Sequence, residues 1–317
     1  MRVVVIGGSG HIGSYLTPRL IEAGHKVLCV SRGQRRPYIE HGAWKQVEQV
    51  TIDRVAEEAA GTFGSRIREL EPDCVVDLTS YTLDSTVQLV EALQGHIQQF
   101  LHCGTIWVHG PAVEVPTTEE QPRKPISDYG VRKAAIESCL LNQARRGRFP
   151  AAVLHPGHLV GVGWIPLNPA ANFNPAVFAD LAAGRDIALP NLGRETLHHV
   201  HADDVAQAFV KAMANWSNAC GESFHVVSPA AVTLAGYAEA VSLWFGREPR
   251  IRFLPWEEWR SSVSEKDAKT TWDHIARSPH CSIRKAQRLL DYQPRYSSLE
   301  AVRESLTWLV AKGVIQA

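Results

Sequence analysis

A short apolar run at residues 2–6 leads directly into the glycine-rich stretch GGSGHIG. Gly7, Gly10 and Gly13 have the spacing G-x-x-G-x-x-G, and apolar residues then recur at helical intervals over residues 11–23. A glycine turn between a buried strand and a helix lets backbone N–H groups approach a pyrophosphate, whose charge the helix N-terminus favours. This feature constrains the fold most, because the motif requires a βαβ unit. We therefore expect a dinucleotide-binding domain, with a tight turn that holds no ligand as the alternative.

The rest of the first half alternates between β-branched runs and amphipathic segments. This alternation predicts an α/β fold, with a doubly wound parallel Rossmann sheet and helical crossovers. We expect strands at residues 2–6, 26–30, 46–52, 74–78, 99–103 and 151–154. We expect helices at residues 11–23, 82–93, 127–145, 282–290 and 299–311.

The pattern changes after about residue 160, where Pro and Asn become frequent and short strands mix with helices. We predict a Rossmann domain at residues 1–160 and a smaller, mixed but mainly helical substrate region at residues 161–317. The chain is expected to return in part to the first domain around residues 196–227.

Composition narrows the classes of partner and compartment. Lys and Arg number 33, as do Asp and Glu, so the formal net charge is zero and nothing overall attracts nucleic acid or a membrane surface. The longest apolar runs fall short of a membrane span, and the N-terminus lacks a signal-peptide pattern. The six cysteines form no C-x-x-C pair, which favours core residues in a reducing compartment. We expect a soluble cytoplasmic protein with a small-molecule substrate and no metal.

The end of the second predicted strand bears on the choice of cofactor. Ser31 and Arg32 lie 18 and 19 residues after Gly13, where an acidic residue would favour NAD. Arginine suits the 2′-phosphate of NADP instead, but it can also stack on adenine or be solvated. We therefore expect NADP or NAD, with NADP favoured by Arg32. Asp53, after the third strand, either contacts the adenine or caps a turn.

The stretch SDYGVRK places Tyr129 and Lys133 four residues apart, so they share one face of a helix. This pair alone is common on surface helices. Together with the glycine turn about 120 residues earlier, however, it resembles the short-chain dehydrogenase/reductase (SDR) superfamily. Residues 102–110, HCGTIWVHG, are similar to that superfamily's S-S-x-x-V-Y-G, and residues 154–161, LHPGHLVG, to its R-P-x-x-x-x-G. The form of the motifs and the length are typical of the extended branch, the NAD(P)-dependent epimerase/dehydratase family, over nearly the whole chain.

This resemblance implies that Thr105, Tyr129 and Lys133 are catalytic. In such enzymes the lysine bonds the nicotinamide ribose and lowers the tyrosine's pKa, while the Ser or Thr bonds the substrate oxygen. Tyr129 would take a proton from an alcohol as hydride leaves, or give one to a carbonyl as hydride arrives.

The resemblance also implies a cofactor site, a substrate pocket and a homodimer through the Tyr/Lys helix and the helix before it. The predicted cofactor-binding residues are Gly7, Gly10, His11, Ile12, Gly13, Ser31, Arg32, Asp53, Thr79, Tyr129, Lys133 and His155. The predicted substrate-binding residues are Tyr81, Trp107, His158 and Asn172. The histidines at residues 198–201 raise the question of a metal site, but their segment resembles a structural element of the family, so none is predicted.

Two departures from the family pattern limit the function. Thr105 is followed by Ile106 and Trp107, where 4,6-dehydratases carry an acidic pair, which argues against a dehydratase. His155 and His158 replace the usual Arg and Asn, so a standard nucleotide-sugar site is not matched.

Three functions stay open. The first is an epimerase of a sugar or sugar nucleotide that works by transient hydride transfer, and the whole-chain resemblance places it slightly ahead. The second is an NADPH-dependent reductase of a small carbonyl compound. The third is a non-catalytic NADP(H)-binding protein, since the early part of the chain also resembles the chloroplast stem-loop-binding branch. Zero net charge and the intact catalytic set argue against the third.

Overall fold

The computed structural model describes residues 1–316 and contains a seven-stranded parallel sheet with the order β11-β6-β5-β4-β1-β2-β3. Its strands are β1 (Arg2–Ile6), β2 (Lys26–Ser31), β3 (Glu48–Thr51), β4 (Cys74–Asp77), β5 (Gln99–Cys103), β6 (Ala151–Pro156) and β11 (Ser223–Val226). The order reverses between β1 and β4, and ligands of doubly wound sheets bind outside the carboxyl ends of the strands at such a point. The α/β fold with a Rossmann sheet is thus confirmed.

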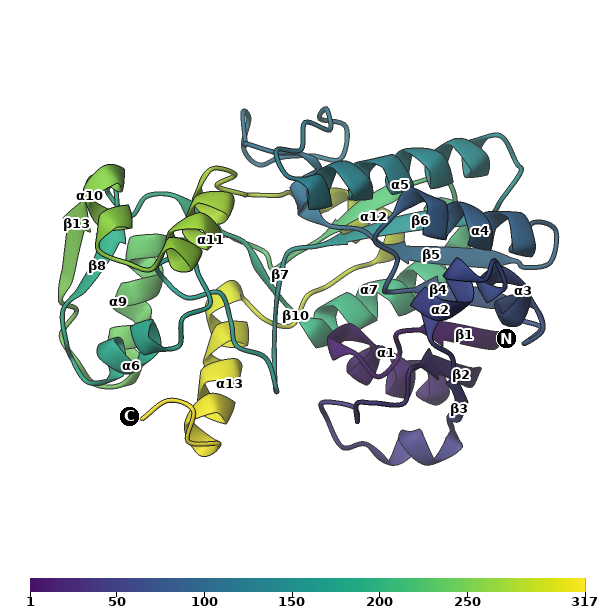
Figure 1. Cartoon of the computed structure of the whole chain (residues 1–317), viewed down its shortest axis with the longest axis horizontal. Coiled ribbons are helices and arrows are strands. Elements are labelled where there is room, and N and C mark those ends of the chain that lie inside the picture. Colours follow the sequence, from purple (N-terminus) through teal and green to yellow (C-terminus); the bar gives the residue numbers. More distant parts are fainter. Residues whose placement is uncertain (317) are drawn as a thin grey trace.

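Helices cover both faces of this sheet (Figure 1). Val3 and Val5 of β1 belong to a core shared with α1, α7 and α12, whereas Val4 and Ile6 face α3, α4 and α5. Burial on both faces explains why the strand sequences are apolar throughout rather than alternating. The helices around the sheet are α1 (His11–Glu22), α2 (Arg54–Ala59), α3 (Phe63–Arg68), α4 (Leu83–Leu93), α5 (Asp128–Arg145), α7 (Ala202–Ala214), α8 (Trp216–Ala219) and α12 (Arg284–Leu290), with 3₁₀ turns η1 (Gly42–Gln46) and η2 (Ile106–Val108).

The remaining elements form a smaller region with its own core, on the left of Figure 1. Its helices are α6 (Ala176–Ala182), α9 (Leu234–Trp244), α10 (Trp256–Ser261), α11 (Glu265–Ile275) and α13 (Ser298–Ala311). Its strands pair as β7 (His158–Val160) with β10 (His199–His201), β8 (Ile187–Pro190) with β13 (Ile251–Leu254), and β9 (Thr196–Leu197) with β12 (Val232–Thr233). Both β7 and β10 lie between the two regions (Figure 1).

The chain crosses between the regions more than once. After β10 it enters α7, which packs on α1, and then β11, which pairs with β6 at the edge of the sheet. These segments lie within and next to residues 196–227, and the predicted domain division at residue 160 stays a prediction.

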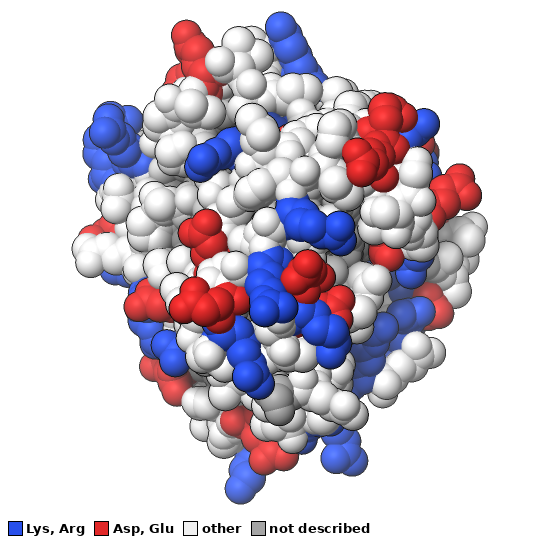
Figure 2. All heavy atoms as spheres, turned by 90° about the vertical axis from the view of Figure 1, so that its left-hand side faces the viewer, with Lys and Arg blue, Asp and Glu red and all other residues white. Residues whose placement is uncertain are grey.

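Most boundaries of the expected elements lie within one residue of the sequence expectation, and three differ by two residues. The third strand begins at Glu48 because Gln46 belongs to η1, β6 runs on to Pro156, and α12 begins at Arg284. None of the helices within residues 1–316 is both long and apolar enough to cross a bilayer. On the face formed by the smaller region, acidic and basic side chains are interspersed (Figure 2).

Candidate active site

The glycine turn after β1 is shaped by close backbone contacts. Gly7 has a φ of +85°, and a Cβ there would lie 2.5 Å from Cγ2 of Thr79. A Cβ on Gly13 would lie 2.3 Å from the carbonyl oxygen of Gly8, so α1 can approach β1 only if glycine stands here. The first intrahelical bond of α1 runs from Ser14 N to Gly10 O at 2.8 Å, which leaves the preceding N–H groups directed out of the helix end. These groups, on His11, Ile12 and Gly13, fit a pyrophosphate.

At the predicted adenosine end of the site, one side chain is exposed and two accept hydrogen bonds from nearby backbone N–H groups. Arg32 is exposed directly after β2, and the Ser31 hydroxyl accepts a hydrogen bond from Gly33 N at 3.2 Å. The Asp53 carboxylate caps α2 by accepting from Val55 N at 3.0 Å. The capping alternative for Asp53 is therefore observed, and its contact with adenine stays a prediction.

Arg54 is a residue that sequence reasoning missed. Its guanidinium donates to Oδ1 of the buried Asp77 at 2.7 Å and to the Thr79 hydroxyl at 3.2 Å. Burial acts to raise the pKa of Asp77, but Arg54 overcomes this effect and holds the pKa below its usual value. The pair therefore fixes Thr79 against Gly7, at the switch point of the sheet. In the sequence, only its position directly after the candidate residue Asp53 pointed to a role for Arg54 in the site.

The structure brings Thr105 and Tyr129 together. Tyr129 lies in the first turn of α5, which Ser127 caps by accepting from Gly130 N at 3.3 Å. Thr105 caps η2 by accepting from Trp107 N at 3.3 Å, and its side chain lies near enough to the Tyr129 phenol to lower the phenol's pKa in part. A hydroxyl and a phenol thus converge at one point, as the chemistry of the family requires.

Lys133 is anchored deep below this pair. It is 2% exposed, and its Nζ donates to Ser80 O and Cys103 O, each at 2.7 Å, beyond β4 and at the end of β5. Its Nζ also lies 3.4 Å from Nε2 of His102 and 5.1 Å from the centre of the Tyr81 ring. Burial lowers the pKa of Lys133. The hydrogen bonds to the two carbonyls partly offset the cost of removing the ammonium from water.

One expectation about Lys133 and Tyr129 is wrong in this structure. We expected Lys133 to lower the pKa of Tyr129. Although the residue keeps 39% of its surface exposed, desolvation of the phenol raises its pKa above the ordinary value, and the nearby Thr105 side chain opposes that effect only in part. The reason is that the ammonium is directed at backbone carbonyls. Tyr129 therefore holds its proton.

Aromatic and imidazole rings form the side of the site that faces the smaller region. The Trp107 ring lies edge-on to Tyr129 at 6.0 Å and to His274 at 5.1 Å, and the Arg277 guanidinium lies 3.8 Å above its centre. Tyr81 lies 6.5 Å from Tyr129. Two of these residues, in and just after α11, were not predicted, because the C-terminal region carries no motif that marks them.

His158 lies between rings of both regions. Its ring is 5.1 Å from His274 and 5.9 Å from His199, and among the described residues neither of its nitrogens has a hydrogen-bond partner. Burial lowers the pKa of His158 well below its usual value and that of His274 to about 4. Both rings are therefore neutral near pH 7 and suit neutral polar groups.

Two predicted site residues are directed elsewhere. Asn172 is 2% exposed, and its amide is bonded within the protein to Thr271 Oγ1 at 3.1 Å and to Asn168 at 2.7 Å, so it stabilises a loop instead of facing substrate. His155 accepts a hydrogen bond from Thr105 N at 2.9 Å, and its other nitrogen faces Glu137. It therefore lies behind Thr105, and a direct contact with cofactor is not supported.

A second layer of rings covers the start of α1. The Trp164 ring stacks on His11 with centroids 4.8 Å apart and an angle of 9°, and Tyr38 lies edge-on to both. Gly161 N donates to Ser305 of α13 at 2.7 Å. The loop after β7 thereby joins the glycine turn to the last helix.

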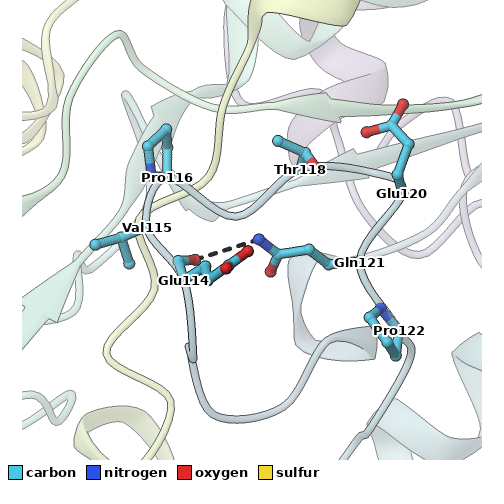
Figure 3. Close-up of a pocket in the computed structure, with 7 residues that line it drawn as sticks. All are labelled: Glu114, Val115, Pro116, Thr118, Glu120, Gln121 and Pro122. Carbon is cyan, nitrogen blue, oxygen red and sulfur yellow. Dashed lines mark hydrogen bonds between the residues drawn. The ribbon is translucent and has the colours of Figure 1, made fainter.

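A hollow of about 710 Å³ lies elsewhere, within the loop that joins η2 to α5 (Figure 3). It is lined by Glu114, Val115, Pro116, Thr118, Glu120, Gln121 and Pro122. Gln121 points across it, with Nε2 donating to Glu114 O at 3.4 Å. The catalytic set does not line this hollow, which belongs to the loop alone.

The Rossmann sheet, the glycine turn and the Thr-Tyr-Lys arrangement define a nucleotide-dependent enzyme of the SDR type. The chain belongs to the NAD dependent epimerase/dehydratase family, whose model matches residues 3–226.

Known proteins similar to this chain have several activities. The 2′-dehydrokanamycin reductase of Streptomyces kanamyceticus is 26% identical, over 99% of this chain and 86% of that protein. The UDP-glucose 4-epimerase of Mycolicibacterium smegmatis is 27% identical over 67% of this chain and 73% of that protein. The solved UDP-glucose 4-epimerase of Thermotoga maritima has a TM-score of 0.75 at 20% identity, covering 98% of this chain and 99% of its own. These relatives support an extended SDR oxidoreductase without fixing a substrate.

Proposed function

We propose that this protein is an NADPH-dependent reductase that acts on a carbonyl group of a sugar-like molecule. The observation that carries the proposal is the placement of the Tyr129 phenol, in the first turn of α5, beside Thr105 directly after β5, with burial raising the pKa of the phenol. A neutral phenol is the acid form that carbonyl reduction needs, whereas oxidation of an alcohol needs a base.

Two further observations support reduction with NADPH. Arg32 is exposed directly after β2 and can pair with a 2′-phosphate. The relative that covers 99% of this chain and most of its own length is named a reductase of an aminoglycoside. The Trp107 indole beside Tyr129, with the neutral imidazoles of His274 and His158 next in line, suits an uncharged ring with hydroxyl groups.

Each residue then has a defined part. A bound NADPH supplies the hydride. Thr105 donates a hydrogen bond to the carbonyl oxygen, and Tyr129 transfers its proton to that oxygen as negative charge develops. Lys133, whose ammonium donates to Ser80 O and Cys103 O in this structure, would bond the nicotinamide ribose once NADPH is bound. Ile106 is buried in the core, so the position after Thr105 supplies no second acid for elimination of water.

A sugar-nucleotide epimerase is the second candidate. Its support is the sequence similarity to UDP-glucose 4-epimerases, such as the one from Mycolicibacterium smegmatis. Against it, His155 and His158 stand where the family carries Arg and Asn, and His155 is directed into the protein.

The test is oxidation of NADPH in the presence of a panel of keto-sugars and aminoglycoside ketones, with Tyr129→Phe as the comparison. We expect turnover with at least one member of the panel and a loss of about 10² to 10⁴-fold in Tyr129→Phe, with NADPH binding retained. A Tyr129→Phe protein that turns over at the wild-type rate would contradict the proposal. So would a wild type that isomerises sugar nucleotides but never consumes NADPH.

A further inference from the structure

A buried chain of polar groups lies behind Thr105. Glu137 stands on α5 one turn beyond Lys133 and is 3% exposed. Its carboxylate accepts a forked pair of bonds from Arg123, Nε to Oε2 at 2.9 Å and Nη2 to Oε1 at 2.5 Å. The same Oε1 lies 3.0 Å from Nε2 of His155, although the approach to the imidazole is bent. Three side chains from separate segments, Arg123, Glu137 and His155, thus connect to the backbone N–H of Thr105.

The charge of Glu137 is set by its partners. Burial acts to raise the pKa of its carboxyl, but His155 and the Arg123 guanidinium overcome this effect and hold the pKa well below its usual range. A buried carboxylate is tolerated only when it is paired and hydrogen-bonded. Arg123 supplies the permanent positive charge of this group.

The position of the His155 ring determines where Thr105 lies. Nδ1 accepts from Thr105 N at 2.9 Å, so it carries no proton, and the ring proton resides on Nε2, facing Glu137. The ring also lies directly on Gly104, where a Cβ would be 2.3 Å from Nδ1. A rotated or doubly protonated ring would lose the bond and displace the backbone that carries the Thr105 hydroxyl.

Arg123 is itself held rigidly. Its Nη1 donates to Glu119 O at 2.6 Å and to Gln121 O at 2.8 Å, and Nη2 lies 3.2 Å from the Ser223 hydroxyl at the start of β11. The guanidinium therefore connects the loop before α5 to the edge of the sheet. Two residues, Glu137 and His155, lie between Arg123 and Thr105 in this series of contacts.

We propose that Arg123 is a positioning residue for the catalytic Thr105. Acting through Glu137, it holds His155 as the tautomer that accepts from Thr105 N–H, and so keeps the Thr105 hydroxyl against Tyr129. The kinetic consequence rests on the proposed function, but the structural consequence does not.

The experiment compares Arg123→Met with Arg145→Met. Arg145 is the matched control, because it stands at the end of α5, the helix that carries Glu137, lines a second hollow together with Arg123, and donates one hydrogen bond, to Gly221 O at 2.9 Å. The first readout is amide hydrogen exchange at Thr105, measured by NMR on the folded proteins. We expect exchange about tenfold faster in Arg123→Met, as for a lost hydrogen bond, and unchanged in Arg145→Met.

The second readout is turnover of the carbonyl substrate. We expect kcat to fall about tenfold in Arg123→Met, while the Kd for NADPH stays within about twofold of the wild-type value. In Arg123→Lys we expect part of the kcat and part of the protection of the Thr105 amide from exchange to be retained. If Arg123→Met fails to fold, the same comparison is made with Arg123→Lys, which retains the charge but loses the paired hydrogen bonds to Glu137. This variant should show a smaller increase in the exchange rate of the Thr105 amide.

Exchange at Thr105 that matches the wild type in the folded Arg123 variant would overturn the inference, whatever the kinetics. If the wild type reduces no carbonyl while Thr105 exchange responds to Arg123, the proposed function fails and the inference stands.

Discussion

At the scale of residues, burial decides which groups around Tyr129 are charged. It raises the pKa of the phenol and lowers those of Lys133, His158 and His274. The imidazoles and the phenol are thus neutral near pH 7, and Lys133 donates to two backbone carbonyls. Such a site favours proton donation to an uncharged substrate.

The choice of dinucleotide is tested at Arg32. If the proposed NADPH site is right, Arg32→Ala removes a charge that would pair with the 2′-phosphate, so we expect NADPH affinity to fall about fivefold, or about 1 kcal/mol, with NADH affinity unchanged. Arg66→Ala, an exposed arginine on α3, is the control and should change neither. The measurement is a fluorescence titration of each variant with both dinucleotides. An equal loss for the two would show that Arg32 stacks on adenine instead.

Residue identity predicted part of the site. The chemistry of Thr105, Tyr129 and the glycines follows from local motifs, and the structure brings the first two together. His155 and Asn172 were placed by analogy with family positions, but their hydrogen bonds are with the protein. Arg54 and Arg277 lie far from these motifs in the sequence, and Arg123, six residues before Tyr129, is part of none of them, so their contacts follow only from the fold.

At the scale of elements, periodicity predicted the Rossmann half well and the rest poorly. Strands buried on both faces, such as β1 and β5, begin and end at the expected residues because their apolar runs are uninterrupted. The short strands β7 to β10 and β12 have two to four residues, too few for a periodic pattern to show. Their pairing depends on the loops that bring them together.

The loop that precedes α6 provides a test at this scale. Asn172→Ala removes the bonds to Asn168 and Thr271, so we expect a loss of about 1 to 3 kcal/mol in the free energy of unfolding. The KM for substrate should change by less than about twofold, because the amide is used within the loop. Chemical denaturation and steady-state kinetics measure the two quantities. A large rise in KM without loss of stability would restore Asn172 to the substrate site.

At the scale of the whole molecule, the site lies where two separate cores meet. The larger region supplies the cofactor turn, Thr105 and the α5 pair, and the smaller one supplies rings from α11 and its neighbours. The loop after β7 connects the two through Trp164 on His11 and Gly161 on Ser305. The expected homodimer through α4 and α5 stays a prediction.

The cofactor's exchange with solution tests the central claim most directly. The freshly purified protein is denatured, and the released small molecules are identified and counted by mass spectrometry. A reductase must exchange its dinucleotide in each turnover, so we predict less than one dinucleotide per chain and, in titration, tighter binding of NADPH than of NADH. One tightly held NAD⁺ per chain would contradict the account, because it is the mark of a hydride cycle that closes within an epimerase.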